Sequence, residues 1–183
     1  MPLKKLTACA LFTALIAILA QISIPLPFSP VPFTGQVVGI FLAGILLGGK
    51  AGLLSVTAYL LLGAAGAPVF SLARGGIHML TGPGGGYLIG FIPAVYCCGR
   101  IMKVKSRPYL QLAIAGVTIP LLFIYFFGGL QLALIMQYTP LQALMIGVIP
   151  YIPLDLLKAA LALFLAPRIK KSLQRNRLDH ILK

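Results

Sequence analysis

The chain has 183 residues, of which 60% are hydrophobic and only 9% are charged, and its mean hydropathy is +1.02. So few charges cannot cover the surface of a water-soluble domain of this size, and the composition therefore indicates an integral protein of the lipid bilayer. The net charge of +13 does not indicate nucleic-acid binding, because the basic residues lie in short clusters between apolar runs. Such clusters are typical of the cytoplasmic loops of multi-pass membrane proteins.

Six apolar segments predict an all-α membrane protein in which residues 1–183 form a single domain of six transmembrane helices. Roughly 20 residues are needed to cross a hydrocarbon core of about 30 Å. In chain order, we expect these helices at Leu6–Ile24, Gln36–Leu47, Gly52–Gly66, Gly84–Met102, Leu110–Leu130 and about Ile149–Ala166. The second and third segments are short, so we expect them to be tilted or to lie against protein rather than lipid.

The distribution of lysine and arginine predicts the orientation of the chain. If the amino terminus is inside, the inner segments hold thirteen of these residues and the outer segments hold one, Arg74. The remaining cation, Lys158, lies within the last span. Since lysine and arginine are enriched in cytoplasmic loops, this bias predicts that both termini are cytoplasmic.

Two of the predicted outer loops are unusual. Residues 25–34 read Pro-Leu-Pro-Phe-Ser-Pro-Val-Pro-Phe-Thr, and the four prolines exclude a helix and favour a stiff, extended path. The second loop, Gly66–Gly86, is rich in glycine and contains Phe70. Because loops this apolar do not suit water, we expect both to fold back onto the bundle and cap a site. Irregular backbone near the membrane is tolerated where it is buried in protein or lines a cavity.

The last span contains the strongest candidate for a binding site, Asp155 followed three residues later by Lys158. An ionisable group at membrane depth costs from about 2.5 to well over 10 kcal/mol. At this spacing both side chains share one helix face, and counting back from Pro167 places Asp155 about 12 Å below the outer surface. The pair is therefore either neutralised internally or used on a polar ligand, and we favour the ligand.

Two further motifs are weaker. The glycine-rich segment Gly82–Gly90 lacks the GxxxxGK[ST] order of a phosphate loop, so we exclude nucleotide binding there. Glycines at a helix start expose N–H groups that suit an anionic ligand group, although a packing role fits equally well. In the first span, Ala10 and Ala14 form a small-xxx-small pattern. This pattern lets helices approach closely in lipid, either within the chain or with a partner.

The sequence predicts neither an enzyme nor a metal site. It has no HExxH motif and no carboxylate pair, because Asp155 and Asp179 are its only acidic residues. Its loops are also too short to contain a domain that hydrolyses ATP. If the chain transports a solute uphill, the energy must therefore come from partner proteins.

Taken together, four segments resemble the BioY family, the biotin-specific substrate-binding (S) components of energy-coupling factor (ECF) transporters. They are Pro30–Thr34 with Gln36, the stretch from Leu60 to Phe70, Gly82–Phe91, and Pro153–Lys158. The resemblance covers most of the chain and implies the six-helix S-component fold. It also implies a multi-pass protein of a prokaryotic cell membrane that captures biotin outside. Such a protein works with a transmembrane coupling (T) subunit and two cytoplasmic ATPases.

The resemblance also implies roles for particular residues. The implied substrate-binding residues are Asp155, Lys158, Arg74, Tyr87, Gly85 and Gln36. The small residues Ala10 and Ala14 match the motif with which such components dock the coupling subunit. The chain itself is expected to bind no cofactor, because ATP is used by the partner ATPases.

Biotin has a ureido ring with two N–H donors and a carbonyl, an apolar middle and a terminal carboxylate. Side chains three residues apart on a helix have Cβ atoms only about 5–6 Å apart, which is less than the length of biotin. We therefore expect Asp155 and Lys158 at the ureido end, with Arg74 or the backbone of Gly84–Gly86 at the carboxylate. The competing pose, with Lys158 on the carboxylate, stays open.

Other functions are compatible with parts of the pattern. An S component or a facilitator for another small, vitamin-like solute is the main alternative. A membrane enzyme or a lipid-handling protein is disfavoured, because the sequence contains no catalytic constellation. Association with a coupling subunit and ATPases separates an S component from a stand-alone channel.

Overall fold

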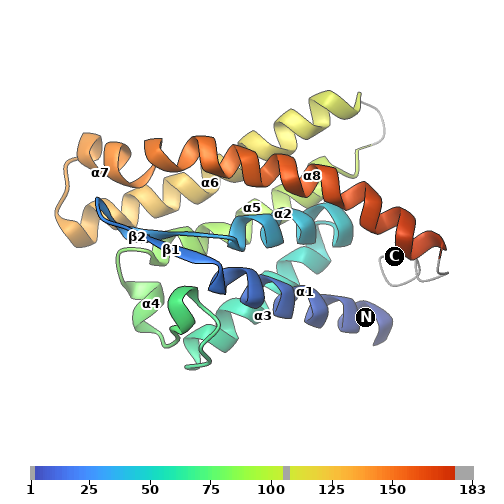
Figure 1. The fold of residues 1–183 in the computed structure, drawn as a ribbon, viewed down its shortest axis with the longest axis horizontal. Coiled ribbons are helices and arrows are strands. Elements are labelled where there is room, and N and C mark those ends of the chain that lie inside the picture. Colours follow the sequence, from blue (N-terminus) through green and yellow to red (C-terminus); the bar gives the residue numbers. More distant parts are fainter. Residues whose placement is uncertain (1–2, 105–107, 176–183) are drawn as a thin grey trace.

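The computed structural model describes residues 3–104 and 108–175. Its longer helices run roughly side by side: α1 (Leu3–Gln21), α2 (Gln36–Leu47), α3 (Gly49–Ala64), α5 (Gly85–Ile101), α6 (Tyr109–Met136) and α8 (Ile152–Arg175) (Figure 1). Short elements gather at one end of the bundle: β1 (Ser23–Leu26), β2 (Ser29–Thr34), α4 (His78–Thr81) and α7 (Pro140–Gly147). We call this the hairpin end; α1 begins and α8 finishes at the opposite end.

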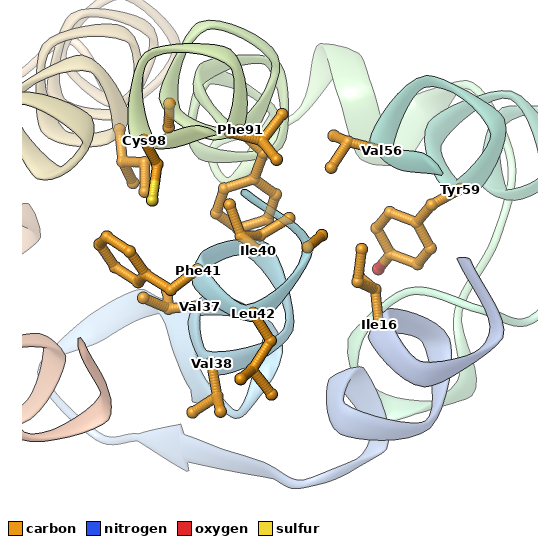
Figure 2. Close-up of a cluster of buried hydrophobic side chains, with 14 of the residues drawn as sticks. Ile16, Val37, Val38, Ile40, Phe41, Leu42, Val56, Tyr59, Phe91 and Cys98 are labelled. Carbon is orange, nitrogen blue, oxygen red and sulfur yellow. The ribbon is translucent and has the colours of Figure 1, made fainter. Parts of the chain in front are cut away.

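Helix α2 forms the centre of the bundle. Eleven of its twelve residues are buried, and a helix that is apolar all round must be enclosed by other elements. Figure 2 shows its side chains meeting three neighbouring helices, through Ile16 of α1, Val56 of α3 and Phe91 of α5. Helix α8 also packs against it. The shortness of this segment therefore reflects a helix that lies against protein, one of the two possibilities expected from the sequence.

Helices α5 and α6 pack with their backbones in close contact. A Cβ atom at Gly86 would lie 2.1 Å from the carbonyl oxygen of Phe127, and one at Gly90 would lie 2.9 Å from the Cα of Ile124. Small residues at such positions let helices associate in lipid, where no hydrophobic effect drives them together. The glycines of the segment 82–90 therefore include a helix-packing stripe.

The prediction of an all-α protein is wrong for residues 23–34. The two strands pair as an antiparallel hairpin, with Ser23 opposite Thr34 and Ile24 opposite Phe33. Proline removes a backbone donor and is confined to free strand edges, and each strand of a two-stranded hairpin has such an edge. The extended path expected from the prolines is present, but the pairing between the two halves depends on contacts that the local sequence does not show.

Several predicted helix ends also need correction. Helix α6 runs to Met136 instead of Leu130, and it is followed by α7 and the 3₁₀ turn η2 (Ile149–Tyr151), which were not expected. Helix α8 continues through Pro167 to Arg175. Proline inside a helix is tolerated in membrane proteins because neighbouring groups satisfy the freed carbonyl, so Pro167 does not end the helix.

Three helical segments among the described residues are long and apolar enough to cross a membrane: Leu3–Gln21, Tyr109–Met136 and Pro140–Arg175. The other three apolar helices, Gln36–Leu47, Gly49–Ala64 and Gly85–Ile101, are shorter. The structure is thus a mostly helical membrane-type bundle with three clear spans.

The contact between α5 and α6 generates a stability prediction. Gly86→Ala forces the two helices apart, because the new methyl group overlaps the Phe127 carbonyl. We expect the variant to unfold at a lower temperature in detergent, with a loss of about 1–3 kcal/mol typical of overpacking. Gly84→Ala is the matched control, because a Cβ there meets nothing within 4 Å. Equal melting of the two variants would contradict the close approach of α5 to α6.

Candidate functional site

A cavity of about 270 Å³ lies at the hairpin end of the bundle. Its wall includes β2, the first turn of α2, the loop between α3 and α5, and parts of α5, α6, η2 and α8. Both unusual loops predicted from the sequence therefore contribute to this wall. The expectation that they fold back onto the bundle is confirmed by this position.

Five of the six predicted substrate-binding residues line the cavity: Gln36, Arg74, Tyr87, Asp155 and Lys158. They come from four separate parts of the chain, and the fold brings them to one cavity. This placement makes binding by these residues possible, while their roles stay predictions.

Gly85, the sixth predicted residue, does not line the cavity. A Cβ there would lie 1.9 Å from the carbonyl oxygen of Leu80, and its own N–H donates to the carbonyl of Gly82 at 3.0 Å. The preceding Gly84 lines the cavity instead and faces open space. Gly85 is therefore closely packed at the start of α5, and its contact with a ligand stays a prediction.

Asp155 and Lys158 form an ion pair in the cavity wall, with Lys158 Nζ 2.7 Å from Asp155 Oδ1. Both residues are less than a tenth exposed. The other carboxylate oxygen, Oδ2, accepts a hydrogen bond of 2.9 Å from the hydroxyl of Tyr125 on α6. The ammonium group lies 3.7 Å from the ring centroid of Phe33 on β2. The pair is thus neutralised internally and also lines the cavity.

Tyr125 and Phe33 were missed from the sequence. A hydroxyl group in the middle of an apolar span was the available signal for Tyr125, because a buried tyrosine hydroxyl needs a partner. Phe33 gave no such signal, since nothing in its local sequence shows that it would cover an ammonium group. Aromatic faces attract cations within about 6 Å, so Phe33 stabilises the charged form of Lys158.

Arg74 supplies the unbalanced charge of the cavity. Arg74 lines the cavity and is exposed, and its guanidinium makes no hydrogen bond or ion pair with any residue in 3–104 or 108–175. Because Asp155 and Lys158 cancel each other, Arg74 leaves the cavity with excess positive charge. A guanidinium suits a carboxylate, to which it donates two parallel hydrogen bonds.

The polar groups of Gln36 and Tyr87 already make hydrogen bonds within the protein. The Gln36 side-chain oxygen accepts from Thr34 at 2.9 Å, and its nitrogen donates to the hydroxyl of Tyr59. The hydroxyl of Tyr87 donates to the carbonyl of Gly147 at 2.7 Å. These two residues therefore shape the wall, and Tyr87 presents its ring more readily than its proton to a ligand.

Ala10 and Ala14 lie away from the cavity, on an apolar groove of about 570 Å³ between α1 and α3. Both alanines are exposed. The α1–α3 contact is made by other residues, because the hydroxyl of Thr13 donates to the carbonyl of Ser55 at 2.9 Å. Internal packing therefore does not account for the two alanines, and docking of a partner stays a prediction.

Comparison with known proteins identifies the family. The model of the BioY family matches residues 1–175. The biotin transporter BioY of Thermotoga maritima is 41% identical over 171 residues, which cover 92% of this chain and 97% of that protein. A probable biotin transporter BioY of Pyrococcus horikoshii is 41% identical over 170 residues, covering 93% of this chain and 98% of the relative.

A solved structure has the same fold. The crystal structure of the S-component for biotin from an ECF-type ABC transporter superposes with a TM-score of 0.85 at 34% sequence identity. The match covers 92% of this chain and 91% of the solved chain. With a family model that extends from residue 1 to residue 175 and relatives that match over nine tenths of its length, this chain belongs to the BioY family.

Proposed function

We propose that this chain captures biotin at the hairpin end of the bundle and takes it up as the S component of an ECF transporter. Membership of the BioY family and the likeness to the solved biotin S-component support this function. The observation that carries it is the buried Asp155–Lys158 ion pair in the wall of the cavity. The pair offers both an acceptor and a donor to the ureido ring.

The proposal extends to the arrangement in the membrane. All six apolar helices cross the bilayer of a prokaryotic cell, and both termini are cytoplasmic. The three shorter helices support this, because α2 is enclosed by other helices and does not need the length of a lipid-exposed span. The excess of basic residues in the predicted inner segments supports the orientation.

The proposal also includes partners. A transmembrane coupling subunit contacts the Ala10–Ala14 face of α1, and two cytoplasmic ATPases supply energy by hydrolysing ATP. The exposed apolar groove beside these alanines supports this role, since small residues permit close helix contact in lipid. The chain itself needs no cofactor in this scheme.

The charges in the cavity favour one orientation of biotin. An ionised carboxylate has about four acceptor sites and an ammonium has three donors, so Asp155 and Lys158 keep capacity for a ligand after pairing. Asp155 accepts from a ureido N–H and Lys158 donates to the ureido oxygen. Because Lys158 is already neutralised and Arg74 is not, the biotin carboxylate lies at Arg74. Lys158 on the carboxylate is the competing pose.

Asp155→Asn tests the ureido contact. The variant keeps the size of the side chain, removes its charge and leaves Lys158 without its counter-ion. We expect biotin affinity to fall by about 1.5–3 kcal/mol, the value of a hydrogen bond to a charged group, as measured by calorimetric titration of purified protein. A folded variant that binds biotin as tightly as the wild type removes Asp155 from the site.

Tyr125→Phe tests the support of Asp155 by α6. The variant keeps the ring but loses the hydrogen bond to Asp155 Oδ2. We expect a loss of biotin affinity of about 0.5–1.5 kcal/mol, the net value of a typical hydrogen bond, in the same titration. Tyr96→Phe is the control, because Tyr96 is exposed and lies outside the cavity. Equal affinities of the two variants would show that Tyr125 does not support the site.

Ala10→Trp and Ala14→Trp test partner docking. A large side chain on this face blocks close approach of a partner helix, so we expect uptake of labelled biotin by cells to be lost. Binding to the purified protein is expected to stay unchanged, because the groove lies away from the cavity. Leu11→Trp is the control, since Leu11 is 65% exposed on α1 but does not line the groove. Loss of binding in step with uptake would assign the alanines to the fold.

A further inference from the structure

A tight turn at residues 70–74 carries part of the cavity wall. The Phe70 N–H donates to the carbonyl of Arg74 at 2.9 Å, which closes the turn. At its tip, in the 3₁₀ segment η1 (Ser71–Ala73), Leu72 and Ala73 have φ angles of 60° and 52°. Left-handed backbone is uncommon for residues other than glycine, and two in succession store strain. The surroundings must therefore hold this conformation.

The left-handed conformation of Leu72 and Ala73 is not stabilised by burial of these residues. Leu72 is 40% exposed, and Ala73 is also exposed. The turn is fixed at its base, because Phe70 is fully buried with its ring against Gly63, where a Cβ would lie 2.1 Å away. This anchor leaves the far side of the turn to be held by another group.

That group is Gln21, the last residue of α1. Its side-chain oxygen accepts a hydrogen bond of 2.9 Å from the N–H of Ala73. Its side-chain nitrogen donates to the carbonyl of Phe70 at 3.2 Å. One amide therefore bonds both sides of the turn and satisfies the N–H of a strained residue.

Three residues of the turn line the cavity: Phe70, Ser71 and Arg74. Arg74 follows Ala73 directly, so the conformation of Ala73 sets the direction in which the Arg74 backbone leaves the turn. Gln21 does not line the cavity, and its side chain is exposed, so it acts through hydrogen bonds rather than through packing.

We infer that Gln21 is a positioning residue that holds the strained turn at Leu72–Ala73 and so aims Arg74 at the carboxylate of the bound ligand. The inference rests on the proposed function for the identity of that ligand. It gives the end of α1 at Gln21 a role in ligand binding, although no residue of α1 lines the cavity.

The first test measures the stability of the turn in the absence of ligand. Amide hydrogen exchange of peptides covering residues 70–76 is compared in the wild type, Gln21→Met and Gln111→Met. Gln21→Met nearly conserves the volume but cannot accept from the Ala73 N–H. We expect faster exchange in this variant only, because Gln111 is exposed on α6 and remote from the turn. Unchanged exchange in Gln21→Met would overturn the inference.

The second test asks whether Gln21 acts through Arg74. Biotin and biotin methyl ester are titrated into the wild type, Gln21→Met, Arg74→Gln and the double variant. We expect Gln21→Met to weaken biotin binding about tenfold, to change binding of the ester less than about twofold, and to have no further effect in Arg74→Gln. Coupling of this kind is what a double-mutant cycle isolates.

A penalty of equal size for biotin and its ester, persisting in Arg74→Gln, would show a general structural role and overturn the inference. Gln21→Asn provides a second variant, because it keeps the amide but shortens the side chain by one methylene and should give the same pattern. If the wild type does not bind biotin, the proposed function fails, while the exchange experiment still decides whether Gln21 holds the turn.

Discussion

The ion pair between Asp155 and Lys158 is the interaction on which the site depends. A charge in an apolar environment is costly unless it is paired and hydrogen-bonded. Here the carboxylate is paired through Oδ1 and hydrogen-bonded through Oδ2 to Tyr125, and the ammonium is covered by Phe33. The pair therefore joins α8 to α6 and to β2 around one cavity. Removing either charge leaves the other buried without its partner, so we expect single substitutions here to affect both the fold and ligand binding.

The packing of the other helices positions the cavity around this pair. Helix α2 is enclosed on all sides, so its first turn reaches the cavity from the centre of the molecule. The close contact of α5 with α6 at Gly86 and Gly90 brings Tyr87 and Tyr125 to the same wall. The α1–α3 groove lies apart from the cavity, so a ligand and a membrane partner can occupy separate surfaces of one small chain.

The helical fold and the main candidate residues could be predicted from the sequence, because a lipid bilayer permits few kinds of structure and disfavours charged side chains. Composition and charge position were sufficient to predict a helical membrane protein, and Asp155 and Lys158 stood out because acidic residues are so rare in the chain. The hairpin at residues 23–34 could not be predicted, because prolines exclude a helix without specifying a strand partner. The hydrogen bond from Tyr125 to Asp155 depends on how α6 meets α8, and the position of Gly85 outside the cavity wall depends on how the start of α5 meets the loop before it. Contacts between elements that are distant in the chain cannot be recognised from the local sequence.

The central claim is that Asp155 accepts a hydrogen bond from the ureido ring of biotin. The most direct measurement is calorimetric titration of the wild type and Asp155→Asn with biotin and with an analogue methylated on its ureido nitrogens. We expect methylation to weaken binding to the wild type by roughly tenfold or more, the effect of losing a hydrogen bond to a charged group. We expect a much smaller effect in Asp155→Asn. An equal loss in both proteins, or no loss in the wild type, would contradict the claim.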